Sequence, residues 1–348
     1  MASAFAAVLQ KGLCATHEII NQLSEIQSLK ERTLDPELLT SFPSLLLTTD
    51  MLLINGRRKL TDLRTEPHPK GSFGTCYVSQ SAKNVYKHIV LDESDLREVL
   101  VEIYIQTVLA HNSVYICKPL RVYRSMDVVR HSRRLAPSTT TTPSLFVEME
   151  YIPYSFSDYM HQLRIANRVG AKLETEDISL LFVYLATVLD ILWTKYAFIH
   201  GDLHVRNIMF SHYGKIKLID FGFSSLSHEG RVYNADMTYP PTKSYDILMF
   251  LCSFMSEAKY YCTPAAVEWC KSLFNMQDGR NLYTIMETVA EAKGKPVFHM
   301  AYYSQLVKYK FLKKVPSHLV DYDEFIRRVS SPPRISVCGR MLRWAFGS

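Results

Sequence analysis

Two short segments in the middle of the chain carry acidic and amide side chains at a spacing that suits phosphoryl transfer. The first, FIHGDLHVRNIMF, contains Asp202 and Asn207. The second, IDFG, contains Asp220, thirteen residues after Asn207. In each segment a strand-like apolar run stands beside a turn. Mg²⁺ prefers oxygen ligands of this kind, and a second carboxylate can orient an attacking hydroxyl. We therefore predict that these three residues form one phosphoryl-transfer site.

The two segments together resemble the signature of the protein kinase superfamily, HxDxxxxN followed by DFG. His200, Asp202 and Asn207 match the first pattern, and residues 220–222 match the second, at the family's usual internal spacing. The resemblance implies that Asp202 is the catalytic base and that Asn207 and Asp220 hold Mg²⁺. A DFG tripeptide alone would mean little, but both patterns in order make a specific signal.

A glycine-rich segment further upstream, PKGSFGTCYV, resembles the nucleotide-binding loop of the same family. Gly71 and Gly74 match its second and third glycines, with Ser72 and Phe73 at the tip, and Pro69 stands where the first glycine would be. Glycine allows the backbone to approach phosphates without a Cβ in the way. Taken alone, this segment would fit a plain hairpin turn better.

Lys87 follows that segment and matches the family lysine that contacts the α- and β-phosphates of ATP. In the family this lysine is held by a glutamate on the next helix. Glu98 and Glu102 are four residues apart and share one face of the predicted helix. We favour Glu102, because the sequence EIYIQTVL continues from it with apolar residues, and Glu98 remains the alternative.

The segment FVEMEYIP resembles the hinge that joins the two lobes of a kinase. The resemblance implies that Met149 lies at the gate to the deeper pocket. It also implies that the backbone of Glu150, Tyr151 and Ile152 offers hydrogen bonds to adenine. Met209, within the first motif, is assigned to the same nucleotide site.

The chain departs from the family pattern near the catalytic residues. Gly201 replaces the arginine that usually precedes the catalytic aspartate, so regulation through a phosphorylated activation loop is not expected. His204 replaces the usual lysine, as in small-molecule kinases and haspin-like enzymes, and we expect it to donate to the γ-phosphate. The segment after Asp220 is short, and YPPTKSYD stands where an APE motif is usual. Asp246 at its end matches the aspartate that braces the catalytic loop.

Strand-like runs come first along the chain and helical runs follow, which predicts an α+β protein with a small β-rich lobe and a larger helical one, the two-lobed fold that the kinase resemblance also implies. Short runs typical of strands occur at residues 75–79, 84–90, 118–124 and 145–149, with an amphipathic helix at residues 92–110. Beyond residue 150 the pattern is helical, interrupted by strands around residues 199–220. We predict a helical extension over residues 1–60, an N-lobe over 61–152 that ends in the hinge, and a C-lobe over 153–348.

Composition excludes several other classes. The net charge of +6 is small and scattered, which does not favour a nucleic-acid partner. The seven cysteines form no CxxC pair, so we expect reduced thiols in an intracellular, cytoplasmic setting. The longest apolar run, residues 180–193, is shorter than a bilayer span and contains Asp190, which favours a buried helix over a membrane role. The sequence does not specify the oligomeric state.

The function expected from these features is a serine/threonine protein kinase that uses ATP and Mg²⁺ and acts on a protein substrate. The first alternative is a small-molecule kinase, which the HGDLH sequence and the short segment after Asp220 favour. The second is a pseudokinase that acts as a binding scaffold, although no metal ligand or lysine is lost. Similarly short, divergent kinases occur in large DNA viruses. If this protein is viral, its setting would be a host cell.

Overall fold

The computed structural model describes residues 75–78, 84–90, 96–125, 144–166, 172–228, 230–234 and 245–330. The predicted N-terminal helical extension and the glycine-rich segment, with Gly71, Ser72, Phe73 and Gly74, lie outside these residues. The chain separates into two compact units between Tyr151 and Ile152, beside the end of the predicted hinge. Each unit is described by itself.

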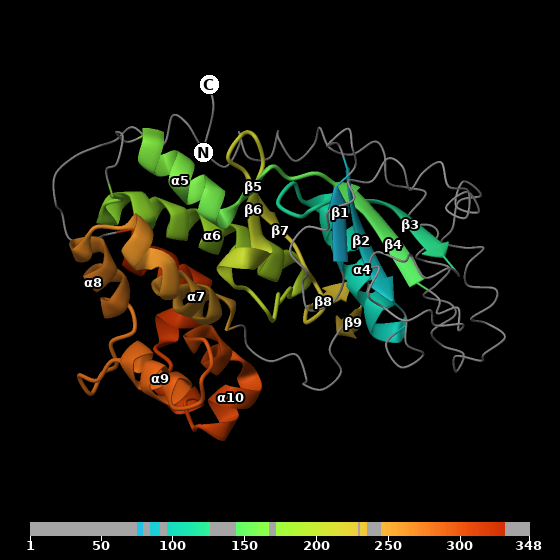
Figure 1. The fold of residues 1–348 in the computed structure, drawn as a ribbon. Coiled ribbons are helices and arrows are strands. Elements are labelled where there is room, and N and C mark those ends of the chain that lie inside the picture. The colour runs from blue at the N-terminus through green and yellow to red at the C-terminus, as the bar shows by residue number, and fades with distance from the viewer. Residues whose placement is uncertain are drawn as a thin grey trace. The chain divides into compact units, whose positions relative to one another are not determined.

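The first unit is built on a four-stranded antiparallel sheet (Figure 1). Its strands are β1 (Thr75–Val78), β2 (Asn84–Val90), β3 (Pro119–Ser125) and β4 (Ser144–Glu150), in the order β1-β2-β4-β3. All four were predicted to within one residue. The register places Lys87 of β2 opposite Cys76 of β1 and Val147 of β4, in the interior of the sheet.

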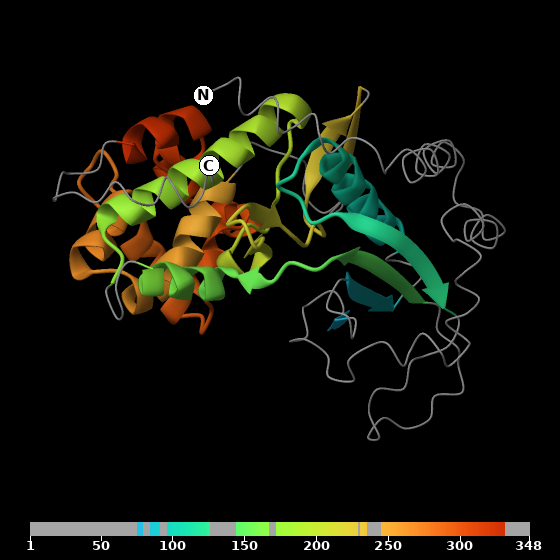
Figure 2. The same cartoon turned by 90° about the horizontal axis from the view of Figure 1, so that it is seen from above.

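One helix, α4 (Leu96–Asn112), packs on this sheet, as Figure 2 shows from above. Its Val99 and Ile103 meet apolar side chains from three strands, and Met149 packs against the same cluster. The strand members of the cluster are Ile89, Val122, Leu145 and Val147. Leu145 and Val147 alternate on one face of β4, and Phe146 and Glu148, which point to the other face, are buried as well, so both faces of β4 are buried. The described helix begins four residues later than predicted.

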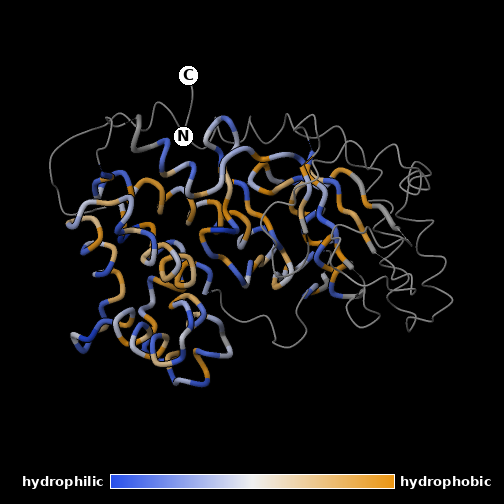
Figure 3. The backbone as a smooth tube through the Cα atoms, viewed as in Figure 1, coloured by the Kyte–Doolittle hydropathy of each residue, from blue (hydrophilic) through white to orange (hydrophobic). Residues whose placement is uncertain are grey.

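The second unit is largely helical and is organised around α6 (Thr175–Tyr196) and α7 (Asp246–Tyr261). Every residue from Asp246 to Met255 is buried, so α7 is surrounded by protein, and its apolar character can be followed in Figure 3. Edge-to-face ring contacts join Phe182 of α6 to Phe250 and Phe254 of α7, at centroid distances of 5.6 and 5.2 Å.

By length and composition α6 could cross a membrane, but the core helix of a globular protein passes the same test. Half of its apolar stretch is buried inside this unit. The helix α11 (Tyr322–Val329) packs against it, and the Ser179 hydroxyl donates to the Val329 carbonyl at 2.5 Å. The packing agrees with the interpretation of this run as a buried helix.

Short strands interrupt the helices where the two motifs lie. The strands β5 (Tyr154–Ser155), β6 (Ile208–Phe210) and β7 (Ile216–Leu218) form one antiparallel sheet. A second hairpin, β8 (Ser225–His228) with β9 (Arg231–Asn234), follows and was not predicted. The 3-10 turn η3 (Val205–Asn207) leads directly into β6.

Near the start of this unit lies α5 (Phe156–Ala166), drawn in green in Figure 1. The C-terminal part continues as short helices: α8 (Pro264–Ser272), α9 (Leu282–Glu291), η4 (Val297–Ala301), α10 (Tyr303–Lys308), η5 (Leu312–Lys314) and η6 (Ser317–Leu319). The small β-rich unit followed by a larger helical one is the α+β architecture that the sequence predicts.

Candidate active site

The loop at residues 198–207 is held in place by the N-terminus of α7. Both carboxylate oxygens of Asp246 accept backbone hydrogen bonds, Oδ2 from His200 N at 2.9 Å and Oδ1 from Gly201 N at 3.0 Å. Asp246 is 2% exposed, so its charge depends on these donors. This is the bracing contact that the resemblance implies for Asp246.

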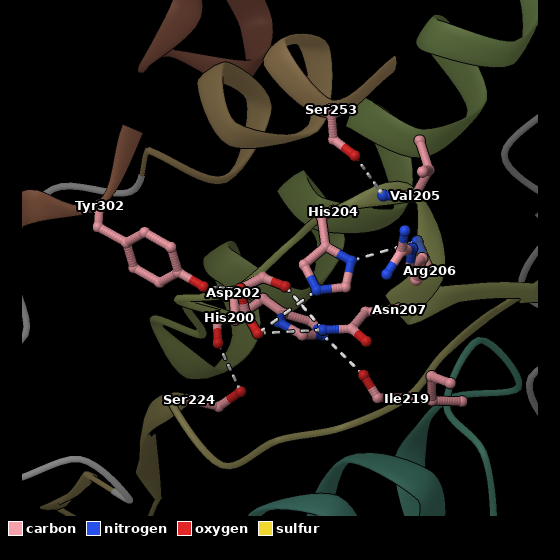
Figure 4. Close-up of polar contacts among 10 residues, drawn as sticks. All are labelled: His200, Asp202, His204, Val205, Arg206, Asn207, Ile219, Ser224, Ser253 and Tyr302. Carbon is pink, nitrogen blue, oxygen red and sulfur yellow. Dashed lines mark hydrogen bonds and ion pairs between the residues drawn. The ribbon is translucent and has the colours of Figure 1, made fainter. Parts of the chain in front are cut away.

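Three further hydrogen bonds fasten the same loop (Figure 4). Ser253 of α7 accepts from Val205 N at 3.2 Å, and Ser224 donates to the His200 carbonyl at 2.8 Å. The His200 ring bonds through Nε2 to the Ile219 carbonyl at 3.0 Å. The 198–207 loop is therefore tied to α7 on one side and to the 219–224 segment on the other.

Gly201 is required by the backbone at this point. Its φ is +77°, in the left-handed region that favours glycine. A Cβ added there would lie 2.3 Å from the Phe223 carbonyl oxygen, much closer than any real contact. The departure from the family's arginine therefore has a steric cause, because no side chain fits between the two segments.

Asp202 and Asn207 lie side by side in this loop and are both buried. The Asn207 Nδ2 group donates to the main-chain oxygen of Asp202 at 2.8 Å. This leaves Asn207 Oδ1 as an acceptor, and no described residue donates to it. Burial raises the pKa of the Asp202 carboxyl, and the charge of Asp220 adds to this effect.

Asp220 follows β7 with a φ of +63°, which is unusual for a residue that carries a Cβ. The neighbouring residues fix it there. Ile219 N donates to the Asn207 carbonyl at 3.1 Å, and the fully buried Phe221 ring packs on His200 at 5.5 Å. A strained backbone held by its surroundings indicates that the direction of the Asp220 side chain matters.

The imidazole of His204 is neutral at physiological pH. Burial, with the nearby His200 and Arg206, lowers its pKa to about 4. Its Nδ1 accepts a hydrogen bond from Arg206 N at 3.2 Å, so Nε2 carries the hydrogen. Nε2 lies 3.6 Å from Asp202 Oδ2, which is too long for a hydrogen bond. His204 can donate to a phosphate oxygen, but it adds no positive charge.

In the first unit, Lys87 and Glu102 are in direct contact. The distance between Lys87 Nζ and Glu102 Oε1 is 2.6 Å, and both side chains are largely buried. Glu98 is exposed, so of the two candidate glutamates Glu102 is the one beside the lysine. Their roles toward a nucleotide remain predictions.

The predicted hinge residues are partly engaged within their own unit. The Met149 sulfur accepts from Gln106 Nε2 at 3.5 Å, and Met149 is half-buried. The Glu150 amide already donates to the Lys118 carbonyl at 2.9 Å, so it is not available to adenine. Tyr151 and Met209 are half-buried and Ile152 is buried. A nucleotide contact for these residues remains a prediction.

One residue that contacts Asp202 was not found from the sequence. Tyr302 follows η4 and donates its hydroxyl hydrogen to Asp202 Oδ1, as Figure 4 shows. In the same segment, the Phe298 ring lies 5.2 Å from the His204 ring. We call residues 297–302 the cover segment. Its sequence, VFHMAY, has no spacing or residue type that would have singled it out.

Comparison with known protein families matches residues 70–245 to the protein kinase domain, which is half of the chain. With the two-part fold and the geometry around Asp202, this shows that the chain belongs to the protein kinase superfamily. It is accordingly a phosphotransferase of the kinase class. A search of curated proteins found no match.

The chemistry of the side chains around Asp202 fits a magnesium ion. No group of three or more His, Cys, Asp or Glu side chains in the described part of the chain could hold a metal ion. Mg²⁺, however, is usually bound by one or two protein ligands together with substrate phosphates. The acceptor-only Oδ1 of Asn207 and the carboxylate of Asp220 are hard oxygen donors of this kind.

Proposed function

We propose that this kinase transfers the γ-phosphate of ATP to a serine or threonine hydroxyl of a protein substrate. The observation that carries the proposal is the buried Asp202 carboxylate, held in a braced loop beside the open Oδ1 of Asn207. A fixed carboxylate next to hard oxygen ligands suits reactions in which catalysis is mostly positioning and electrostatics.

In the proposed reaction, the acceptor oxygen bonds to the γ-phosphorus and the bond from that phosphorus to the β–γ bridging oxygen breaks. Asp202 orients the acceptor hydroxyl and receives its proton, and ADP leaves. Asn207 and Asp220 would hold Mg²⁺, which when bound neutralises charge on the phosphates. Lys87, held by Glu102, would contact the α- and β-phosphates. His204 would donate a neutral hydrogen bond to the transferred group.

The test is transfer of ³²P from γ-labelled ATP with Mg²⁺ to generic protein substrates and to the enzyme itself, followed by phosphoamino-acid analysis. We expect label on serine or threonine, reduced about 100-fold or more in Asp202→Asn. Asp323→Asn on α11 is the matched control, because that aspartate is exposed and should leave transfer unchanged. Label that persists fully in Asp202→Asn would contradict the assignment of the base.

A small-molecule kinase is the second candidate. The observation in its favour is that the cover segment contacts both Asp202 and His204, which limits the room for a peptide beside the catalytic carboxylate. Transfer to small alcohols or amino sugars, with no label on protein, would favour this candidate. ATP binding without any transfer would favour a pseudokinase scaffold.

We also propose an intracellular, cytoplasmic setting, with a protein substrate and no nucleic-acid or membrane partner. In support, no disulfide joins the five cysteines within the described residues to one another, as expected in a reducing compartment. Burial raises the pKa of the Cys262 thiol to about 12, which keeps it unreactive.

A further inference from the structure

The Asp202 carboxylate is buried but receives little support from its own loop. Only 8% of the residue is exposed, so its ionised form needs hydrogen-bond donors. Within the loop, Asn207 Nδ2 reaches Oδ2 at 3.4 Å and His204 Nε2 lies at 3.6 Å. Both distances are longer than a good hydrogen bond to a carboxylate, which is about 2.7–2.9 Å.

The close donor comes from Tyr302, one hundred residues further along the chain. Its hydroxyl donates to Asp202 Oδ1. In the part of the chain that the structure describes, no other side chain makes a close hydrogen bond to this carboxylate. The donor is therefore supplied by the cover segment and not by the motif that contains the aspartate.

The Tyr302 side chain is fixed by its surroundings. Its ring packs on Phe223 at 6.1 Å and against the edge of His299 at 5.7 Å. Its carbonyl accepts the first hydrogen bonds of α10, from Gln305 N and Leu306 N, both at 2.9 Å. A side chain anchored by a helix start and two rings loses little freedom when it holds a partner, which makes it a suitable positioning group.

The two carboxylate oxygens therefore have different environments. Oδ1 is occupied by Tyr302, whereas Oδ2 has only the two long contacts. We propose that Tyr302 is a positioning residue for the transfer reaction: it fixes the Asp202 carboxylate through Oδ1 and leaves Oδ2 for the acceptor hydroxyl. This inference rests on the proposed function of Asp202.

The charges around Asp202 support this role. Burial raises the pKa of the carboxyl and the Asp220 charge raises it further, while the Tyr302 hydrogen bond, His200 and His299 lower it. His204, which also faces Oδ2, is neutral. Among the lowering groups the Tyr302 hydrogen bond acts most strongly. Removing that hydroxyl should therefore move the pKa of Asp202 upward.

The kinetic test compares Tyr302→Phe with Tyr309→Phe. The first keeps the ring contacts and removes the hydroxyl from Asp202. The second removes a hydroxyl from a ring that packs on Phe311 in the same part of the chain. For Tyr302→Phe we expect kcat to fall about tenfold or more, KM for ATP to stay unchanged, and the acid limb of the pH–rate profile to move to higher pH. Tyr309→Phe should match the wild type.

An unchanged or higher kcat with an unmoved acid limb would overturn the proposal. A higher kcat would mean that Tyr302 competes with the acceptor for Asp202 instead of positioning it. A fall in kcat with no change in the pH profile would also count against it, because a merely structural defect lowers the rate in that way.

A second measurement does not depend on activity. Crystal structures of Tyr302→Phe, Tyr309→Phe and the wild type are compared. We expect the Asp202 carboxylate to leave its wild-type orientation in Tyr302→Phe only. An unmoved carboxylate would overturn the inference even if transfer is observed. A moved carboxylate in a protein without transfer would instead show that the proposed function fails while the contact is real.

Discussion

His204 is the residue of the 198–207 loop whose charge is most strongly changed by its surroundings. Burial, with His200 and Arg206 nearby, lowers its pKa to about 4. A histidine whose pKa is depressed in the folded state stabilises the fold fully above the unfolded pKa of about 6.5. It loses that contribution as pH falls from there to about 4, because the unfolded chain binds the proton first.

We therefore expect His204→Gln to be less sensitive to acid than the wild type. Between pH 7 and pH 4.5 the wild type should lose about 2–3 kcal/mol more unfolding free energy than the variant, which is the linkage cost of a pKa shift of this size. Urea denaturation at the two pH values measures this. His161→Gln on α5 is exposed and serves as the control. Equal losses in wild type and His204→Gln would show that His204 is not held neutral.

Asp220, a proposed metal ligand, has a backbone conformation that is unfavourable for residues with a Cβ. A residue with a Cβ at a φ of +63° carries a cost of about 1–2 kcal/mol, which glycine does not carry. On the proposed function, the carboxylate of Asp220 holds Mg²⁺, a role that glycine at this φ could not perform. Stability and activity should therefore respond in opposite directions at this position.

We expect Asp220→Gly to be about 0.5–1 kcal/mol more stable to denaturant than Asp220→Ala, since both remove the carboxylate and only glycine relieves the backbone. Both should lose phosphoryl transfer by about 100-fold or more, as should Asp220→Asn. Denaturation curves and labelled-ATP assays on the three variants check this. Near-full transfer in Asp220→Asn would contradict the metal-binding assignment.

At the scale of elements, the site depends on how closely the 198–207 loop approaches residues 223–225, where β8 begins. Ile199 pairs with Ser225 through backbone hydrogen bonds of 2.9 Å in both directions. Gly201 lies against the Phe223 carbonyl in the same pairing. The two motif segments are thus joined by paired backbone hydrogen bonds and by close backbone packing at Gly201.

Gly201→Ala should cost about 2–4 kcal/mol, from the left-handed backbone and from the clash with Phe223. Gly279→Ala isolates the backbone part, because Gly279 has a φ of +80° and nothing within 4 Å of the added Cβ. We expect that control to cost only about 1 kcal/mol. Thermal or urea unfolding of both variants measures the difference. Equal costs would mean that the loop relaxes away from Phe223.

Sequence patterns predicted the elements well where the pattern is local. The strands of the first unit were placed to within one residue, because runs rich in β-branched and aromatic residues such as NVYKHIV end at turn-forming segments. The pairing of Lys87 with Glu102 needed the three-dimensional packing of α4, since Glu98 shares the same helical face. The hairpin β8–β9 carried no recognisable alternation and was missed.

Tyr302 could not be predicted from the sequence for a different reason. Its partner lies one hundred residues earlier, and nothing in the sequence around it forms a motif. The neutral state of His204 was likewise unpredictable, because it follows from burial and not from residue type. Asp246, which holds the 198–207 loop, could be found because it belongs to a recognisable sequence pattern, whereas Tyr302 belongs to none.

At the scale of the whole helical unit, stability rests on the contact between α6 and the last described helix, α11. Phe325 of α11 is 2% exposed and its ring lies 6.2 Å from the ring of Phe182 in α6. Phe182 also stacks on Trp269 of α8 at 5.9 Å. These rings cover part of the apolar surface of α6, while Leu180 and Trp193 on the same helix remain exposed.

Phe325→Ala should therefore cost about 3–5 kcal/mol, the usual range when a large ring is removed from a core. Tyr213→Ala is the control, because that aromatic side chain is 79% exposed. Chemical denaturation of both variants provides the comparison. A loss below about 1 kcal/mol in Phe325→Ala would mean that α11 is not part of the cooperative core.

Tyr302 contacts Asp202 from one hundred residues further along the chain, and this separation limits how far the enzyme could be shortened. A protein trimmed to the family match would end at residue 245, with both signature motifs intact. It would lack Asp246, the carboxylate that anchors the loop, and Tyr302, the hydroxyl that reaches the base. If Tyr302 has the positioning role proposed above, a minimal version that keeps full activity would have to extend through α10, well past the last recognisable motif.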